Sequence, residues 1–171
     1  MLTLVIGGAA SGKSEFAEAH VMTLPGQRVY IATMEPFDRE CLSRIQRHRQ
    51  MRLEKGFETV ECYMDLTTAS LPPHGNVLLE CMTNLVANER YSARGGGLSS
   101  VLGGIHDLSG RCDHLTVVSG DLFSGGKDYL GDTTAYLHDL ALVNRHIAQL
   151  ADLVVEVTAG LPHVWKGALP W

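Results

Sequence analysis

A short glycine-rich segment near the start of the chain constrains the fold more than any other feature. An apolar run at residues 2–6 precedes it and is typical of a buried strand, and residues 12–22 after it are typical of a helix. The segment itself reads Gly7, Gly8, Ala9, Ala10, Ser11, Gly12, Lys13 and Ser14. It matches G-x-x-x-x-G-K-[ST], the phosphate-binding loop (P-loop), and therefore predicts a protein that binds a nucleoside triphosphate.

The residue types of this loop fit the chemistry of phosphate binding. Glycines let the backbone turn so that successive N–H groups face phosphate oxygens, and the start of the following helix adds a favourable dipole. We expect Lys13 to reach the β- and γ-phosphates as a positive charge and the Ser14 hydroxyl to ligate Mg²⁺. Lys13 is therefore a candidate catalytic residue as well as a binding residue.

Beyond this loop, predicted strands alternate with predicted helices. The alternation predicts an α/β fold with a mainly parallel central sheet flanked by helices. We expect a P-loop NTPase fold of the RecA-like kind, with residues 1–171 forming a single nucleotide-binding domain. Two glycine-rich stretches, residues 94–104 and 120–131, are expected to be loops. The predicted strands are residues 2–6, 28–32, 57–62, 77–80, 115–119 and 153–157, and the predicted helices are residues 12–22, 38–53, 82–91 and 132–150.

Charge and hydropathy argue against several classes of protein. The net charge of −5 at pH 7 gives no general basic field, so we expect no nucleic-acid partner. No apolar run is long enough to cross a bilayer, and the first residues lack the basic region and cleavage site of a signal peptide. We therefore expect a cytoplasmic protein without a membrane span.

Two carboxylates lie at the carboxyl ends of predicted strands, on the side of the sheet where the P-loop is also expected. Glu80 ends the strand at residues 77–80, and Asp121 comes just after the strand at residues 115–119. Ligands of parallel α/β sheets bind at the carboxyl ends of strands, so either side chain is placed to hold Mg²⁺ directly or through water. The alternative is a solvated carboxylate at a strand end. We favour the magnesium role for Glu80 and leave both interpretations of Asp121 open.

A cluster of positive charge lies on the predicted second helix of this acidic chain. Four arginines and a lysine fall between residues 44 and 55, with His48 among them. Such a cluster is often a solvated helix face, and a lone histidine on the same face as Ile45 is usually structural. The same residue types also suit a phosphate-reacting site, because imidazole is a nucleophile near pH 7 and arginines neutralise phosphate charge. From spacing alone, we favour the structural role for His48.

Several blocks of sequence together resemble one enzyme family, the bifunctional adenosylcobinamide kinase / adenosylcobinamide-phosphate guanylyltransferases of cobalamin biosynthesis. Residues 4–14, which include the P-loop, are similar to that family's opening, and Arg44-Ile45-Gln46-Arg47-His48 resembles its segment R-I-Q-x-H. Further similar blocks lie at residues 30–33, 60–62, 78–81, 144–152, 159–162 and 166–167. The resemblance covers most of the chain, and its motifs are more specific in the first half.

The resemblance implies a reaction and a set of site residues. It implies that His48 is a covalent nucleophile that attacks the α-phosphorus of GTP, releases pyrophosphate and carries GMP. The implied acceptor is a corrinoid, adenosylcobinamide, which the enzyme first phosphorylates with GTP or ATP in the presence of Mg²⁺. A homo-oligomer, specifically a trimer, is also implied. The nucleotide-binding residues implied in addition to the P-loop are Ala32, Thr33, Met34, Arg49, Gln50, Met51, Arg52, Glu61 and Glu80. An acidic side chain suits guanine, which offers N1–H and N2–H donors.

The chain departs from the family pattern in its second half. Residues 120–123 read Gly-Asp-Leu-Phe where the family usually has N-E-V-G, and residues 133–139 contain no arginine where the family is arginine-rich. Two other hypotheses therefore stay open. One is a small-molecule kinase without guanylyl transfer, in which His48 is structural. The other is a non-catalytic sensor, in which GTP orders the loop at 94–104 or 120–131 and so gates a partner.

Overall fold

The computed structural model describes residues 1–36, 39–122 and 131–169, and along the second helix it describes only some of the side chains. The strands are β1 (Leu2–Gly7), β2 (Arg28–Ala32), β3 (Phe57–Glu61), β4 (Asn76–Glu80), β5 (His114–Gly120), β6 (Leu153–Thr158) and β7 (Leu161–Lys166). The helices are α1 (Lys13–Met22), α2 (Arg39–Glu54), α3 (Met82–Tyr91), α4 (Gly97–Arg111) and α5 (Asp132–Leu150), with a short 3-10 helix, η1 (Leu66–Thr68). None of these helices is both long enough and apolar enough to cross a bilayer within the described ranges.

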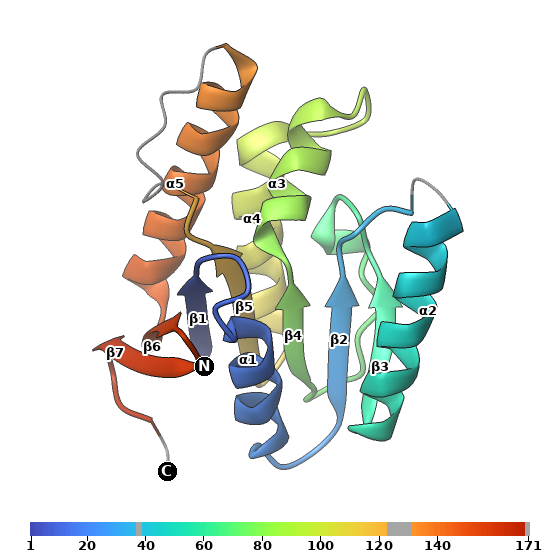
Figure 1. Ribbon diagram of the computed structural model, residues 1–171, viewed down its shortest axis with the longest axis vertical. Coiled ribbons are helices and arrows are strands. Elements are labelled where there is room, and N and C mark those ends of the chain that lie inside the picture. The colour runs from blue at the N-terminus through green and yellow to red at the C-terminus, as the bar shows by residue number, and fades with distance from the viewer. Residues whose placement is uncertain (37–38, 123–130, 170–171) are drawn as a thin grey trace.

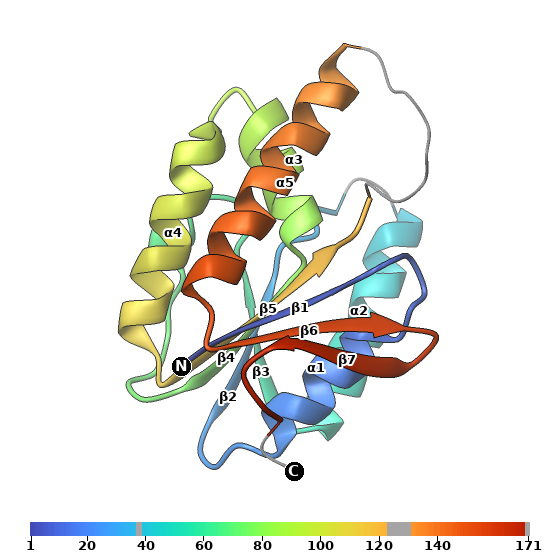
Figure 2. The same ribbon diagram turned by 90° about the vertical axis from the view of Figure 1, so that its left-hand side faces the viewer.

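The strands form one sheet in the order β3-β2-β4-β5-β1-β6-β7. Neighbouring strands are parallel except for β7, which runs antiparallel to β6. Helices α1 and α2 cover one face of this sheet, and α3, α4 and α5 cover the other (Figures 1 and 2). The predicted α/β architecture with a mainly parallel central sheet is therefore confirmed.

Two apolar cores lie on the two faces of the sheet. Side chains alternate between faces along a strand, so Leu4 enters the core beneath α3, α4 and α5 while Val5 enters the core beneath α1. The central strands are buried on both sides, which explains why they appear in the sequence as continuous apolar runs. The largest buried side chains of the two cores include Leu4, Ile31, Phe57, Leu78, Leu79, Met82, Leu85, Ile105, Leu108 and Leu140.

The expectation of a loop at residues 94–104 is wrong, because α4 begins within this stretch. Val101 and Ile105 are buried and fall at helical spacing, one turn apart. Gly104 belongs to the packing surface of this helix, since a Cβ added there would lie 2.8 Å from the Cβ of Leu66 on η1. Gly104 therefore allows α4 to pack closely against η1. A glycine-rich sequence by itself does not show whether its glycines form a loop or a close helix contact.

The chain beyond β6 forms β7, an edge strand that the sequence did not predict. Ala159 and Gly160 have positive φ angles of 51° and 78° and connect β6 to β7 through a two-residue turn. Pro162 is tolerated because an edge strand leaves some N–H groups without a ladder partner. The Gly160 N–H donates to the Ser11 carbonyl at 2.8 Å, so this turn packs against the P-loop. Most of the other predicted loop, residues 120–131, lies outside the described residues.

Candidate functional site

The P-loop lies at the carboxyl end of β1, where the chain turns through residues 8–12 into α1 (Figure 1). Gly12 has a φ of 90°, a left-handed conformation that favours glycine. Within the loop, the Ser11 N–H donates to the Gly8 carbonyl at 3.3 Å. Lys13 Nζ donates to the same Gly8 carbonyl at 3.0 Å, so its ammonium group folds back over the loop backbone. The predicted loop and its lysine are thus assembled at the start of α1.

Gly7 and Gly8 offer a direct test of how tightly this loop is packed. A Cβ at Gly7 would lie 2.5 Å from the Val157 carbonyl oxygen and 2.6 Å from Ser11 Oγ, whereas a Cβ at Gly8 would have nothing within 4 Å. We expect Gly7→Ala to displace the loop, weaken GTP binding and destabilise the fold by about 1–3 kcal/mol. Gly8→Ala, the matched control, should change stability by less than about 0.5 kcal/mol. Urea unfolding and calorimetric titration with GTP measure both effects, and normal stability and binding in Gly7→Ala would contradict the packing.

Ser14 and Glu80 meet beside the loop, although β5 lies between β1 and β4 in the sheet. Ser14 Oγ donates to Glu80 Oε1 at 2.5 Å, across a separation of 66 residues in the chain. Burial raises the pKa of Glu80, and the hydrogen bond from Ser14 opposes that rise. The fold therefore brings together the two residues that the sequence analysis selected as magnesium ligands.

This pair of oxygen donors suits a hard divalent cation. In nucleotide sites Mg²⁺ is usually held by one or two protein groups together with water and phosphate oxygens. Glu80 Oε2 is buried and has no hydrogen-bond partner within the described ranges, so it presents an acceptor to a cation or to a water bound to one. Among the described residues, no three His, Cys, Asp or Glu side chains group as metal ligands, so phosphate oxygens and water would complete the coordination.

Asp121, the second carboxylate candidate, lies beside the P-loop through its backbone. Its N–H donates to the Gly7 carbonyl at 3.0 Å. Behind it, Asn144 of α5 accepts a hydrogen bond from Ser119 Oγ at 2.6 Å and donates to the Gly120 carbonyl at 3.2 Å. These bonds fix the end of β5 next to the loop and are compatible with both interpretations of Asp121.

The ends of β2, β3 and β4 are joined through Thr33, which is fully buried. Thr33 Oγ1 donates to the Cys81 carbonyl and accepts from the Cys81 N–H, both at 2.8 Å. Asn88 of α3 donates to the carbonyls of Thr33 and Tyr63, each at 2.9 Å. Thr33, a predicted nucleotide-binding residue, therefore supports the strand ends from within.

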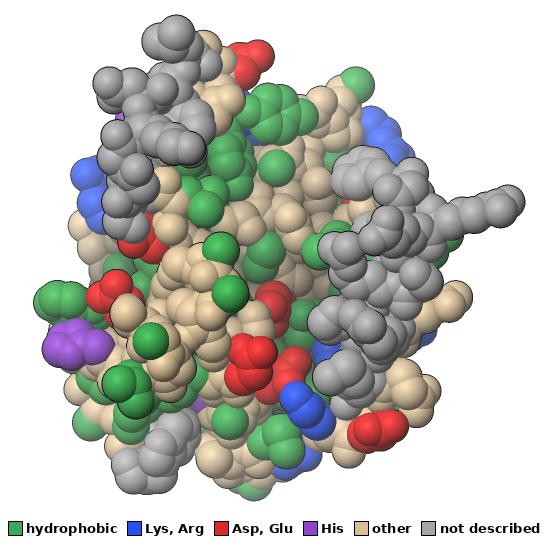
Figure 3. All heavy atoms as spheres, in the orientation of Figure 1, with side chains coloured by type: hydrophobic (Ala, Val, Ile, Leu, Met, Phe, Trp, Pro, Cys, Tyr) green, Lys and Arg blue, Asp and Glu red, His purple; other side chains and the backbone are tan. Residues whose placement is uncertain are grey.

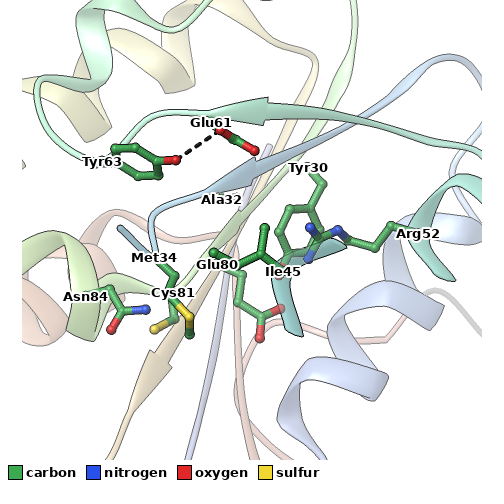
Figure 4. Close-up of a pocket in the computed structure, with 10 residues that line it drawn as sticks. All are labelled: Tyr30, Ala32, Met34, Ile45, Arg52, Glu61, Tyr63, Glu80, Cys81 and Asn84. Atoms are coloured by element: carbon green, nitrogen blue, oxygen red, sulfur yellow. Dashed lines mark hydrogen bonds between the residues drawn. The ribbon is translucent and has the colours of Figure 1, made fainter. Parts of the chain in front are cut away.

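A pocket opens across these strand ends (Figure 4). Five of the predicted nucleotide-binding residues line it: Ala32, Met34, Arg52, Glu61 and Glu80. Five further described residues line it and were not selected as site residues from the sequence: Tyr30, Ile45, Tyr63, Cys81 and Asn84. In the space-filling view, acidic and basic side chains gather near the centre of this face (Figure 3).

A second pocket adjoins the first on the side of the P-loop. Tyr30, Arg52 and Glu80 line both pockets. The residues that line only the second are Ser14, Glu15, Glu18 and Lys55. A nucleotide with its phosphates at the start of α1 therefore has space for its sugar and base toward the end of β3.

Glu61 is held from two sides at the β3 end of the first pocket. The Tyr63 hydroxyl donates to Glu61 Oε2 at 2.9 Å (Figure 4), and Arg49 Nη1 lies 3.6 Å from Oε1. Burial and, next, the bond to Glu61 raise the pKa of Tyr63 to about 12, so its phenol remains a donor at neutral pH. The arrangement presents an oriented carboxylate, a group suited to the N–H donors of a base.

Helix α2 forms part of the wall of the first pocket and carries the remaining residues that were predicted to bind nucleotide or to act as the nucleophile. Ile45 and Arg52 line the pocket, and Gln50 is exposed to solvent. The side chains of His48 and Met51 lie outside the described part of the chain, so only their backbone is placed, on α2.

Comparison with known proteins finds similar sequences over nearly the whole chain. A family model described as "Cobinamide kinase / cobinamide phosphate guanyltransferase" matches residues 3–164. The "Bifunctional adenosylcobalamin biosynthesis protein CobP" of Pseudomonas aeruginosa is 30% identical over 174 residues, covering 98% of each chain.

Two further relatives are more similar over a shorter stretch. The "Bifunctional adenosylcobalamin biosynthesis protein CobU" of Salmonella typhimurium is 43% identical over 98 residues, which are 56% of this chain and 53% of the relative. The protein of the same name from Escherichia coli is 45% identical over 91 residues, or 52% and 49% of the two chains. The chain thus spans about half the length of these two relatives in the matched region.

Among solved structures, a protein of Pyrococcus horikoshii shares the fold with a TM-score of 0.52. The likeness covers 97% of this chain and 86% of that one, at 7% sequence identity. At that identity the likeness concerns the fold alone.

Proposed function

The chain belongs to the cobinamide kinase / cobinamide phosphate guanyltransferase family, and from that premise we propose that it phosphorylates adenosylcobinamide and then transfers GMP from GTP to adenosylcobinamide phosphate. The observation that carries the proposal is the contact between Ser14 of the P-loop and Glu80, beside a pocket that also contains Glu61. Phosphate-binding groups and a carboxylate suited to guanine thereby lie at two ends of adjoining pockets. Since all described strands belong to one sheet, we treat residues 1–171 as one nucleotide-binding domain.

In the first reaction, a hydroxyl oxygen of adenosylcobinamide attacks the γ-phosphorus of the nucleoside triphosphate. The new O–P bond forms as the bond to the β-bridging oxygen breaks, the nucleoside diphosphate leaves, and the hydroxyl proton passes to solvent. Lys13 and the backbone N–H groups at the start of α1 offset the negative charge on the transferring phosphoryl group. GTP and ATP both fit this step, because the P-loop binds phosphates and does not contact the base.

We propose that Mg²⁺ accompanies the nucleotide. Ser14 Oγ, with Glu80 directly or through a water, would hold it, and it would neutralise charge on the β- and γ-phosphates. The buried Oε2 of Glu80 supports this assignment. Asp121, beside Gly7, is the alternative carboxylate for a water-mediated contact.

For the second reaction we propose His48 as the nucleophile. An imidazole nitrogen attacks the α-phosphorus, the bond to the bridging oxygen breaks, pyrophosphate leaves, and the imidazole proton is released. A phosphate oxygen of adenosylcobinamide phosphate then displaces the histidine and forms the P–O–P linkage. Position 48 on α2 lies three residues after Ile45 and four before Arg52, and this supports the assignment, because among the described side chains of α2 these two line the pocket.

Labelled GTP separates the two reactions. The protein is incubated with Mg²⁺, adenosylcobinamide and GTP labelled at either the γ- or the α-phosphorus. The proposal expects γ-label in adenosylcobinamide phosphate first and α-label in a second corrinoid product later. Transfer of γ-label alone would leave a kinase without guanylyl transfer, and bound GTP without transfer of either label would leave a nucleotide sensor.

Glu61→Gln is expected to reduce the preference for GTP over ATP. A carboxylate accepts both the N1–H and N2–H of guanine, whereas an amide has a single acceptor oxygen. We expect about a tenfold loss of affinity for GTP and less than about a twofold change for ATP. Calorimetric titration measures both, with Glu58→Gln, an exposed glutamate on the same strand, as the matched control. An unchanged ratio of GTP to ATP affinity would remove Glu61 from base recognition.

We further propose that the chain forms a homo-oligomer, specifically a trimer. β7 is an edge of the sheet, and its large apolar residues Leu161 and Trp165 are 73% and 65% exposed. A second copy of the chain would cover these side chains, as exposed strand edges are commonly covered. Sedimentation equilibrium measures the assembly, and a monomer at all concentrations would contradict it. Because the proposed nucleotide substrates are cytoplasmic metabolites, we also propose a cytoplasmic location.

A further inference from the structure

A stacking contact between β2 and α2 lies at the junction of the two pockets. Arg52 Cζ is 3.8 Å from the centroid of the Tyr30 ring. Both residues are buried, with 7% and 6% of their surfaces exposed. Figure 4 shows the guanidinium of Arg52 against the ring of Tyr30. A cation over an aromatic face is attracted to it, most strongly where water is excluded.

The ring is well placed to fix the plane of the guanidinium. Arg52 Nε is buried and has no hydrogen-bond partner within the described ranges. An arginine side chain has many rotamers, and its planar group binds phosphates best when its orientation is already set. Stacking on Tyr30 sets that orientation without using the N–H donors.

Acidic side chains outnumber basic ones among the described residues that line the pocket on the P-loop side of Arg52. Glu15, Glu18 and Glu80 line the pocket on the P-loop side, and Lys55, which also lines it, pairs with Glu18. The phosphates of a nucleotide would bring further negative charge next to Glu80. Arg52 lines both pockets as a buried cation, so its orientation governs how well this charge is offset.

We propose that Tyr30 is a positioning residue, whose ring holds the guanidinium of Arg52 in the orientation that binds the phosphates of a nucleoside triphosphate. The inference rests on the proposed function for the identity of the nucleotide, but it concerns binding and not guanylyl transfer. The aromatic face is what this role requires, whereas the hydroxyl of Tyr30 interacts with the carboxyl group of Glu80. Phenylalanine should therefore replace Tyr30, and leucine should not.

Calorimetric titration with Mg²⁺ and GTP tests the contact. We expect Tyr30→Phe to bind within about twofold of the parent protein and Tyr30→Leu to bind about tenfold more weakly. Arg52→Ala should weaken binding at least as much. The double variant Tyr30→Leu/Arg52→Ala should bind no more weakly than Arg52→Ala alone, because Tyr30 acts through Arg52.

Phe57→Leu is the matched control for loss of a buried ring. Phe57 lies in the same core as Tyr30, edge-on to it at 6.3 Å between ring centroids, and lines neither pocket. We expect this variant to keep the parent's affinity for GTP. Thermal unfolding without nucleotide shows which variants are folded. If Tyr30→Leu does not fold, Arg52→Lys tests the contact from the side of helix α2. Lysine keeps the positive charge but lacks the planar guanidinium group, so this variant should also bind GTP more weakly than the parent protein.

Two kinds of result would overturn the proposal. One is additive losses in the double variant, or equal losses in Phe57→Leu, because Tyr30 would then be only a core residue. The other is unchanged GTP binding in Tyr30→Leu or Arg52→Lys. Failure of the proposed guanylyl transfer would give a different pattern, in which no covalent adduct forms while this binding series behaves as expected.

Discussion

Lys13→Ala is expected to weaken GTP binding by about a hundredfold and to abolish transfer of the γ-phosphoryl group. Lys13 Nζ lies at the P-loop, 3.0 Å from the Gly8 carbonyl, where the β- and γ-phosphates are proposed to bind. Charge-assisted hydrogen bonds to two phosphates contribute about 1.5–3 kcal/mol each. Lys55 lines the adjoining pocket but pairs with Glu18, so it is a poor substitute. Calorimetric titration with Mg²⁺ and GTP measures the loss.

Lys166→Ala is the matched control for this substitution. Lys166 lies on β7 and donates to the carbonyls of Ala148 and Gln149, near the end of α5. We expect its removal to leave GTP binding unchanged, and thermal unfolding of both variants checks that they fold. A folded Lys13→Ala protein that binds GTP within about threefold of the parent would place the phosphates elsewhere.

His48→Ala is expected to abolish the covalent GMP adduct while changing GTP affinity by less than about threefold. In the proposed mechanism a single imidazole nitrogen forms the N–P bond, so alanine has nothing with which to replace it. In the same proposal, GTP binding depends on the P-loop, Glu61 and Arg52, which the substitution leaves in place. Retention of α-label on denatured protein measures the adduct.

His74→Ala controls for the general loss of a histidine. His74 is exposed and pairs with Asp113 at 3.1 Å. It lies in the turn before β4, at the amino ends of the parallel strands, whereas the P-loop lies at their carboxyl ends. This variant should form the adduct as the parent does. Adduct at the parent level in His48→Ala would remove His48 from the mechanism and favour the kinase without guanylyl transfer.

Local sequence was sufficient to predict most of the elements that build the site. The P-loop is a contiguous motif, and the buried parallel strands appear as apolar runs. The position of Glu80 beside the P-loop was predictable because the carboxyl ends of parallel strands lie on the same side of the sheet. The contact of Glu80 with Ser14 follows from that topology. Tyr63 was accessible by the same reasoning, since it lies two residues beyond Glu61 and points to the same side.

Features set by contacts distant in the chain were not predictable. The packing of Gly104 against Leu66 turns an apparently loop-like stretch into helix α4. The stacking of Arg52 on Tyr30 depends on how closely α2 approaches β2, which neither segment encodes alone. The role proposed for His48 came from the family resemblance, because helical spacing by itself favoured a structural histidine.

Covalent guanylyl transfer is tested most directly by intact-protein mass spectrometry after incubation with Mg²⁺ and GTP. The proposed mechanism predicts a gain equal to the mass of GMP less one water, labile in acid and stable in base, that maps to His48. A parallel incubation with ATP should give no such gain. A protein that binds GTP but shows no gain in mass would contradict the mechanism.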